Sequence, residues 1–306
     1  MMDRPLRIGT RGSPLALTQT TMVRDLLVAA YPDSPPPEII VIRTTGDAVT
    51  DRPLADLGGK GLFTKEIETA LLEDRIDIAV HSMKDVETWL PDGLALDCFL
   101  PRADPRDVLI GGMSIATLPE GARIGTSSIR RAAQILAQRP DVAIVPFRGN
   151  VDTRIAKLAA GEADVTLLAR AGLDRLGRTN VAGTTLDPAE LLPAVAQGIV
   201  GIERRADDDR SAACLVPLNN DHATIAATAE RAMLAVLDGS CRTPIGGLAR
   251  LDGEKLVLEG LVAMPDGSRM HRVRQTGSST DADALGRAVG DELRTLAGPA
   301  FFAALA

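Results

Sequence analysis

The stretch LRIGTRGSPLALTQT, residues 6–20, has the pattern of a strand, a tight turn and the start of a helix. Leu6–Thr10 is short and apolar enough for a buried strand, and Arg11 and Gly12 form the turn. Ser13 followed by Pro14 is typical of an N-cap and the first helical position, which predicts a helix to about Ala30. The free N–H groups at such a junction favour an anion, with Arg11 and Ser13 beside it. The alternative is that Ser13 is only a helix cap.

The same pattern returns in the second third of the chain. RIGT at 7–10 is repeated as RIGT at 123–126, again followed by serine and a helical pattern, and DVTLL at 164–168 resembles DIAV at 77–80. The repeat predicts two similar α/β domains, each presenting a helix N-terminus to a shared cleft. We expect the chain to cross near Pro101–Asp107 and to return within Leu192–Glu203 as a strand of the first domain, which is typical of hinged binding clefts.

A long glycine-rich loop follows the predicted strand EIIVIR, residues 38–43. It ends in GGKG at 58–61 and precedes a predicted helix at 62–74. Its lysine is followed by glycine and not by serine or threonine, so the loop is not a phosphate-binding P-loop. Loops of this length are more often functional than structural, and we expect Lys60 and Phe63 at its mouth.

The third predicted strand, DIAV, runs into HSMKD at 81–85. Ligands of open α/β sheets bind beyond the carboxyl ends of the strands, where Lys84 and Asp85 lie. Asp85 is therefore a candidate for stabilising a cationic intermediate. The alternative is a surface salt bridge, worth at most ~1 kcal/mol.

The second domain concentrates arginine and serine at strand ends and helix starts. RIGTSSIRR contains Thr126, Ser127, Ser128, Arg130 and Arg131, and RGNVDTR, around the turn at Gly149, contains Arg148 and Arg154. Arginine binds carboxylates through a bidentate fork, so the cluster predicts a polyanionic ligand. The alternative is a set of structural salt bridges.

Cys241 lies in DGSCRTPIGG, residues 238–247, where glycine and proline predict a turn. The adjacent arginine favours the reactive thiolate, which suggests that Cys241 carries a covalent group; the alternative is an ordinary free cysteine. Cys98 and Cys214 lie in apolar runs and are expected to be buried. After a helix at 220–237 and this turn, Asp252-Gly253 predicts a hairpin joining strands at 248–250 and 255–262. A third strand at 272–275 and an amphipathic helix at 281–297 are expected to follow.

Composition limits the function further. The 306 residues suffice for two or three domains, and 45% hydrophobic with 25% charged residues is ordinary for a soluble globular protein. A net charge of −7 and only 2% aromatic residues disfavour nucleic-acid binding. No signal peptide or membrane helix is evident, and three cysteines without a framework suggest the cytoplasm. No Cys/His spacing indicates a metal site.

Taken together, the motifs resemble the hydroxymethylbilane synthase, or porphobilinogen deaminase, family over nearly the whole chain. The resemblance is carried, in this order, by RGSPLALTQ, RTTGD, GGKGLFTKEIE, HSMKDV, DPRD, GTSSIRR, RGNVDTR, ARAGLDRLG, LPAVAQG and GSCRTPIGG. One departure is Glu87, where the family usually has proline.

The resemblance implies a transferase of haem and porphyrin biosynthesis. It would join four porphobilinogen molecules head to tail, with loss of ammonia, into linear hydroxymethylbilane. The chain would grow on a dipyrromethane cofactor held by a thioether bond to Cys241, with Asp85 as the catalytic carboxylate. The positions implied or expected to bind cofactor and substrate are Arg11, Ser13, Lys60, Phe63, Lys84, Thr126, Ser127, Ser128, Arg130, Arg131, Arg148, Gly149, Arg154 and Gln197, of which Lys60 and Phe63 would gate the cleft. The resemblance implies no metal ion, and it implies that the protein is a monomer.

The implied fold is α/β. Two periplasmic-binding-protein-like domains, residues 1–100 with 197–218 and residues 104–194, would flank a cleft, with a smaller α/β domain at 220–306. Two other functions remain open from the residues. A non-catalytic binding protein for a small polycarboxylate would need neither a covalent adduct nor Asp85. A hydrolase with Cys241 as nucleophile would need a base, and no histidine lies near in sequence.

Overall fold

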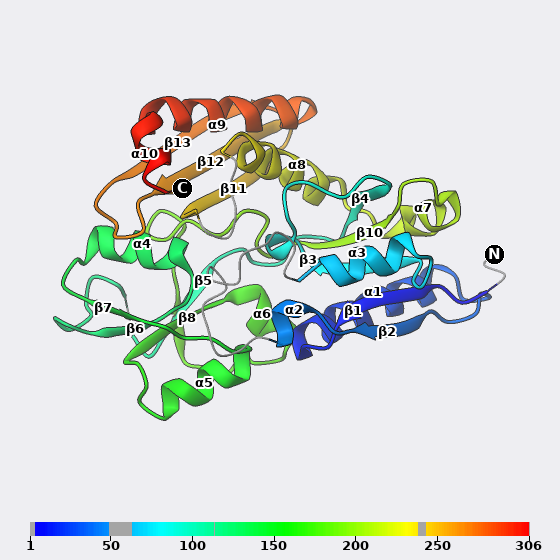
Figure 1. Ribbon diagram of the computed structural model, residues 1–306, viewed down its shortest axis with the longest axis horizontal. Helices are drawn as coiled ribbons and strands as arrows, with labels where there is room; N and C mark the ends of the chain where they lie inside the picture. The colour runs from blue at the N-terminus through cyan, green and yellow to red at the C-terminus, as the bar shows by residue number, and fades with distance from the viewer. Residues whose placement is uncertain (1–3, 49–62, 113, 238–242, 306) are drawn as a thin grey trace. The chain divides into compact units, whose positions relative to one another are not determined.

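The computed structural model describes residues 4–48, 63–112, 114–237 and 243–305. The chain divides into two compact units, which are described separately: Met1–Ala103 with Ile199–Thr224, and Asp104–Gly198 with Ile225–Ala306. Each unit contains a five-stranded mixed sheet, and the second also contains a three-stranded antiparallel sheet (Figure 1). The prediction of an α/β fold is therefore confirmed.

The first unit is built on a sheet of order β2-β1-β3-β10-β4. β1 is parallel to β2 and β3, whereas β10 is antiparallel to β3 and β4. The strands are β1 (Arg7–Arg11), β2 (Glu38–Ile42), β3 (Ile78–Ser82), β4 (Leu94–Phe99) and β10 (Val200–Arg205). As predicted, the returning chain supplies a strand to the first sheet, since β10 inserts between β3 and β4.

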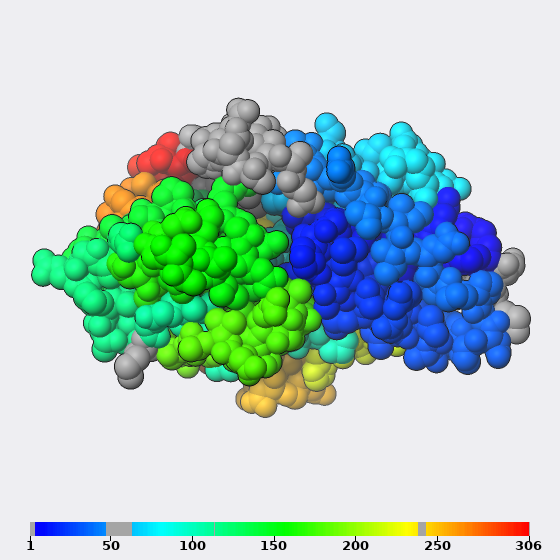
Figure 2. Space-filling model, turned by 90° about the horizontal axis from the view of Figure 1, so that it is seen from below, coloured from blue at the N-terminus to red at the C-terminus, as the bar shows by residue number. Residues whose placement is uncertain are grey.

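Helices cover both faces of this sheet. Apolar side chains of α1 and α7, with the buried Cys98 and Cys214, pack on one face, and those of α3 pack on the other. The helices of the unit are α1 (Pro14–Ala30), α2 (Thr45–Ala48), α3 (Lys65–Leu72) and α7 (Asp209–Leu215), with the short 3₁₀ turns η2 (Met83–Asp85) and η3 (Val216–Leu218). Met22 and Leu26 of α1 and Val41 of β2 remain exposed. The blue part of the chain, which contains α1 and β2, forms part of the face drawn in Figure 2.

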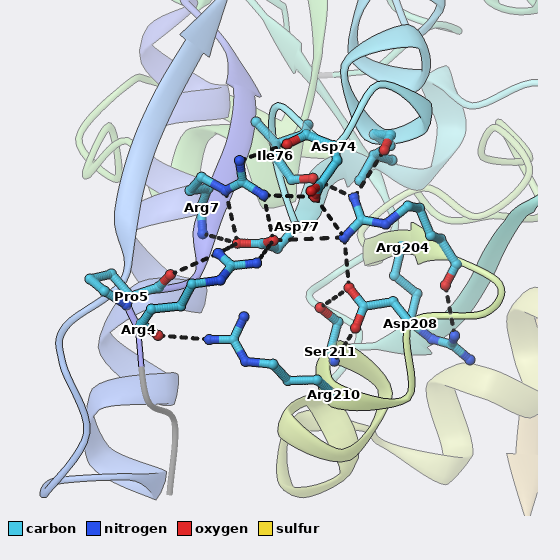
Figure 3. Close-up of polar contacts among 12 residues, drawn as sticks. Arg4, Pro5, Arg7, Asp74, Ile76, Asp77, Arg204, Asp208, Arg210 and Ser211 are labelled. Atoms are coloured by element: carbon cyan, nitrogen blue, oxygen red, sulfur yellow. Dashed lines mark hydrogen bonds and ion pairs between the residues drawn. The ribbon is translucent and has the colours of Figure 1, made fainter.

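The amino-terminal edge of the sheet is fixed by buried Asp77. Its carboxylate accepts two hydrogen bonds from the guanidinium group of Arg4 and others from the backbone and side chain of Arg7 (Figure 3). Burial alone would raise the pKa of Asp77, but these arginine hydrogen bonds outweigh burial and hold the pKa well below its ordinary value. Arg205 extends the network to Asp208, at 2.8 Å.

The sheet of the second unit has the order β7-β6-β8-β5-β9. β6 is parallel to β7 and β8, and β5 is antiparallel to β8 and β9. The strands are β5 (Asp107–Ile110), β6 (Arg123–Gly125), β7 (Ala143–Val145), β8 (Val165–Ala169) and β9 (Gly183–Thr185); the helices are α4 (Ile129–Gln138), α5 (Val151–Ala159) and α6 (Arg170–Arg175). In each sheet the antiparallel strand beside the parallel three is the one that follows a crossing of the chain.

The repeat seen in the sequence extends to hydrogen bonds. The backbone N–H of Arg7 donates to the carboxylate of Asp77 at 2.8 Å, and that of Arg123 donates to the carboxylate of Asp164 at 2.7 Å. Each aspartate lies directly before the third parallel strand of its sheet. The similarity of the two α/β sheets predicted from RIGT is therefore confirmed.

The remaining elements form the C-terminal part of the second unit. The sheet β11-β12-β13 packs through Leu248, Leu261 and Ala263 against Ala133 of α4 and Leu192. Its elements are α8 (Asp221–Val236), β11 (Ile245–Asp252), β12 (Lys255–Ala263), β13 (Met270–Ser278), η4 (Ser279–Asp281), α9 (Ala282–Ala297) and α10 (Pro299–Ala303). The predicted hairpin is confirmed by the pairing of Asp252 with Lys255.

One local prediction was wrong. Ile245–Gly247, expected to belong to the turn around Cys241, begin β11. The two glycines serve close packing: a Cβ on Gly247 would lie 2.7 Å from the Met233 side chain, and one on Gly246 would lie 3.2 Å from the carbonyl oxygens of Leu192 and Pro193. Glycine inside a strand often marks such an approach.

Candidate active site

The carboxyl ends of β1 and β3 in the first unit border a hollow of about 400 Å³, including the part that is open to solvent. This is the edge at which open α/β sheets bind their ligands. Its lining residues come from β1, α1, β3, η2 and the segment before α3: Arg11, Ser13, Leu15, Ala16, Gln19, Phe63, Thr64, Val80, His81, Ser82 and Asp85. Four of the residues singled out in the sequence, Arg11, Ser13, Phe63 and Asp85, are thus brought together.

Arg11 lies between a carboxylate and an aromatic ring. Its Nη1 is 3.8 Å from Oδ2 of Asp85, and its guanidinium carbon is 4.0 Å from the centre of the Phe63 ring. A separation of 3.8 Å is longer than a charge-assisted hydrogen bond of about 2.7–2.9 Å. The side chain of Asp85 is 37% exposed, so the pair contributes at most ~1 kcal/mol and a ligand can displace it.

Three hydrogen bonds shape the rim of the hollow. The hydroxyl of Ser13 accepts the backbone N–H of Ala16 at 3.3 Å, so Ser13 caps α1 as predicted. Gln19 of α1 and Ser82 of β3 are joined twice, at 2.9 and 3.0 Å, which ties the helix to the end of the strand. Lys84 is exposed and adjoins Asp85 in η2.

The second unit places its serine and threonine residues in caps and turns. The hydroxyl of Ser128 accepts the N–H of Arg131 and caps α4, while Thr126 accepts the N–H of Ser128 at 3.1 Å. The hydroxyl of Ser127 accepts the N–H of Phe147 at 2.9 Å. The start of α4 is therefore ordered by its own sequence, as the start of α1 is.

Arg130 and Arg131 are buried and share the carboxylate of Asp107. Arg130 donates to Oδ2 at 2.8 Å and Arg131 donates to Oδ1 at 2.7 Å, while Gln197 donates to Oδ1 at 2.9 Å. Burial would raise the pKa of Asp107, but the two arginine charges and their hydrogen bonds outweigh it and hold the pKa well below its ordinary value. Both guanidinium groups also donate to backbone carbonyls, those of Leu192 and Leu167.

This arrangement is the structural alternative that the sequence left open for the two arginines. It leaves little of either group for a ligand, since each is only 5% exposed. Within the described parts of the chain, Nε of Arg131 has no hydrogen-bond partner. Binding of a ligand carboxylate by Arg130 and Arg131 stays a prediction.

Arg148, Gly149 and Arg154 surround the start of α5. Gly149 has φ +120°, and a Cβ there would lie 2.6 Å from the Thr153 side chain, so the turn requires glycine. Nε of Arg154 donates to the carbonyl of Gly149 at 2.9 Å. Two further predicted residues, Lys60 and Cys241, lie outside the described residues.

The sequence analysis missed a buried cluster of one histidine and two glutamates, His81, Glu203 and Glu68, beside the hollow. Nε2 of His81 lies 2.9 Å from Oε2 of Glu203, and Glu68 of α3 is also buried. Glutamate inside the apolar strand run GIVGIE was a usable signal, because a buried glutamate needs a partner.

The fold and this hollow define the class: a two-unit α/β protein with a carboxylate and an arginine at the carboxyl edge of a sheet, suited to a charged small molecule. Residues 6–213 match the family domain described as "Porphobilinogen deaminase, dipyromethane cofactor binding domain", and residues 224–295 match "Porphobilinogen deaminase, C-terminal domain". The chain belongs to the porphobilinogen deaminase family.

Two relatives named porphobilinogen deaminase agree with this assignment. The porphobilinogen deaminase of Paracoccus denitrificans is 53% identical over 303 residues, which cover 98% of this chain and 97% of that protein. The porphobilinogen deaminase of Nitrobacter winogradskyi is 52% identical over 298 residues, covering 96% and 94%. Among solved structures, the periplasmic aliphatic sulphonate binding protein SsuA from Escherichia coli is 14% identical with a TM-score of 0.42, covering 79% of this chain and 73% of that one.

Proposed function

We propose that this chain joins four porphobilinogen molecules head to tail, with loss of ammonia, to give linear hydroxymethylbilane for tetrapyrrole biosynthesis. The observation that carries the proposal is the 53% identity to a porphobilinogen deaminase over 98% of the chain. The hollow supports it, because Asp85 and Arg11 lie together at the carboxyl edge of the first sheet. The alternative of a non-catalytic polycarboxylate binder is not favoured.

Asp85 is proposed as the catalytic residue. Loss of ammonia from the aminomethyl group leaves positive charge on the methylene carbon and the pyrrole ring. A carboxylate already in place stabilises charge that develops in the transition state without reorganisation at the moment of reaction. Its loose pairing with Arg11, at 3.8 Å, leaves the carboxylate able to turn to the substrate.

The acetate and propionate groups of each pyrrole require cations and hydrogen-bond donors. In the first unit we propose Arg11, Ser13 and Lys84 for this role, with Lys60 and Phe63 at the entrance. In the second unit the proposed positions are Thr126, Ser127, Ser128, Arg130, Arg131, Arg148, Gly149, Arg154 and Gln197. The buried Nε of Arg131, which lacks a partner within the described residues, supports this assignment, since an anion would satisfy it.

The cofactor of the matched family domain is dipyrromethane. We propose that Cys241 holds it through a thioether bond; in the chain, Cys241 lies between the end of α8 at Val236 and the start of β11 at Ile245. The buried donor of Arg131, in the same unit as Cys241, fits a carboxylate of such a group. When bound, the cofactor supplies the nucleophilic pyrrole carbon at which chain growth begins.

We further propose a cytoplasmic monomer with three domains, residues 1–100 with 197–218, 104–194 and 220–306, and with neither a metal nor a nucleic-acid partner. In the parts of the chain that the structure describes, no helix is long and apolar enough to cross a membrane.

The test is to incubate the purified protein with porphobilinogen and to measure product, ammonia and intact mass. The proposal expects hydroxymethylbilane, one ammonia for each substrate consumed, and added mass of a dipyrromethane that is absent in Cys241→Ala. Folded wild-type protein that binds porphobilinogen without releasing ammonia would instead be a binding protein.

A further inference from the structure

Three titratable side chains lie together behind the hollow and have no part in the proposed function so far. They are His81 in β3, Glu203 in the neighbouring strand β10, and Glu68 in α3, which packs on both strands. They are 5%, 0% and 8% exposed. His81 and Glu203 are joined by the 2.9 Å contact between Nε2 and Oε2.

The cluster holds more acid than base. Within the described residues, Oε1 of Glu203 has no hydrogen-bond partner. Burial raises the pKa of Glu68, and the nearby negative charges of Glu203 and Glu87 act in the same direction. Two buried carboxylates thus lie near one imidazole, and a buried carboxylate is costly unless it is hydrogen-bonded or paired with a cation.

His81 connects this cluster to the site, since it borders the same hollow as Asp85. The charged groups near it come from several elements: Glu203 on β10, Glu68 on α3, Arg11 at the end of β1 and Asp85 on η2. From α1 the hollow is lined by Ser13, Leu15, Ala16 and the neutral Gln19.

The proposed reaction, on which this inference rests, requires such a base. Each coupling forms one C–C bond and breaks two bonds: the C–N bond of the incoming aminomethyl group and the C–H bond at the α-carbon of the ring being extended. Ammonia leaves with the electron pair of the C–N bond. The electron pair of the C–H bond returns to the ring and restores its aromaticity, so one proton must be accepted in every cycle. Asp85 is occupied with the cationic centre.

We propose that His81 is the base that accepts this proton, at the ring nitrogen that is not bonded to Glu203. Glu203 accepts the Nε2 proton, which fixes the tautomer and stabilises the imidazolium that forms, as a buried carboxylate does for the histidine of a catalytic triad. The imidazolium then passes its proton to the released ammonia, which leaves the site as ammonium. Glu68 adjusts the charge of the cluster during the cycle.

The test uses porphobilinogen deuterated at the free α-carbon, with wild type, His81→Asn, Glu203→Gln and the control His222→Asn, whose histidine is exposed on α8. Cofactor loading is first confirmed by intact mass. We expect His81→Asn to lose 10²- to 10⁴-fold in rate and to show a primary isotope effect larger than that of wild type. The control should behave as wild type.

Glu203→Gln provides a second readout that does not depend on deleting the base. Removing the negative charge makes the imidazole less basic, so the acid limb of the pH–rate profile should move to lower pH. A slow His81→Asn without an increased isotope effect, together with an unmoved acid limb in Glu203→Gln, would overturn the inference and make the cluster structural. If wild type itself forms no product, the proposed function fails instead.

Discussion

Replacement of Asp107 by asparagine tests whether the buried arginines of the second unit are held by their own fold. Asp107 accepts hydrogen bonds from Arg130, Arg131 and Gln197 at 2.7–2.9 Å and is fully buried. An asparagine that keeps its oxygen toward Arg131 turns its NH₂ group toward another donor, Nη2 of Arg130. Within the described residues, Asp107 is the only carboxylate that pairs with Arg130 and Arg131, so both buried guanidinium groups lose their charged partner.

The expected cost is large. The hydrogen bond from Arg130, worth about 1.5–3 kcal/mol, is lost, and breaking a buried ion pair costs about 3–5 kcal/mol. We therefore expect Asp107→Asn to lower the free energy of unfolding by about 3–5 kcal/mol, a sizeable part of the 5–15 kcal/mol typical of a domain.

The measurement is urea unfolding followed by circular dichroism. The matched control is Asp164→Asn, which alters the ion pair between Asp164 and Arg123 in the same unit. The side chains of Asp164 and Arg123 are 47% and 45% exposed. Because both groups are exposed to solvent, that pair should contribute little to stability. If both variants unfold within 1 kcal/mol of wild type, Arg130 and Arg131 do not depend on Asp107, and the structural account of the network is wrong.

Three further predictions concern single sites. Asp85→Asn should fold and retain its cofactor yet lose turnover by at least 10²-fold, as expected for loss of electrostatic stabilisation. The control Asp92→Asn, at an exposed position, should keep its turnover, and normal product formation by Asp85→Asn would contradict the role of Asp85. Gly149→Ala should lower the free energy of unfolding by at least ~1 kcal/mol, because Gly149 has a positive φ and the added Cβ would meet α5. Gly161→Ala should cost less, because Gly161 has φ +75° but open space around the added Cβ. Equal costs in urea unfolding would refute the steric argument. Arginine holds the pKa of Asp77 below its ordinary value. The contribution of Asp77 to stability is therefore present above the unfolded pKa of ~3.9 and is lost as pH falls through the folded pKa. The difference in stability between wild type and Asp77→Asn should shrink below pH ~4, and a constant difference would exclude this linkage.

The parts of the fold that were predictable are those fixed by nearby residues. Ser13 caps the helix that begins one residue later, and Asp252-Gly253 closes a hairpin between adjacent strands. The repeat RIGT gave a second, independent signal for the two sheets. Local chemistry sufficed for the cap and the hairpin, because their partners lie within a few positions along the chain.

The state of the charged residues was not predictable in the same way. Arg130 and Arg131 look like ligand-binding residues in GTSSIRR, but they meet Asp107, 23 and 24 positions away, only after the sheet has formed. His81 and Glu203 are 122 positions apart and become neighbours because the returning strand inserts beside β3. Burial of charge is a property of the packed fold, so sequence spacing alone could not assign these groups.

The buried acids differ in how fully the fold satisfies them, and that difference indicates function. Asp77 and Asp107 each accept hydrogen bonds from two arginines, and buried Glu230 accepts the backbone N–H groups of Ala196 and Ala249. Glu203 is as deeply buried, yet one of its carboxylate oxygens meets only His81, and within the described residues the other oxygen has no hydrogen-bond partner. Because the fold compensates Asp77, Asp107 and Glu230 with hydrogen-bond donors, it has little structural reason to leave Glu203 incomplete. A group that exchanges a proton in each cycle, by contrast, needs an environment that is not locked by arginine. The incomplete acid is also the one joined to the wall of the hollow that contains Asp85, which is where proton exchange is needed.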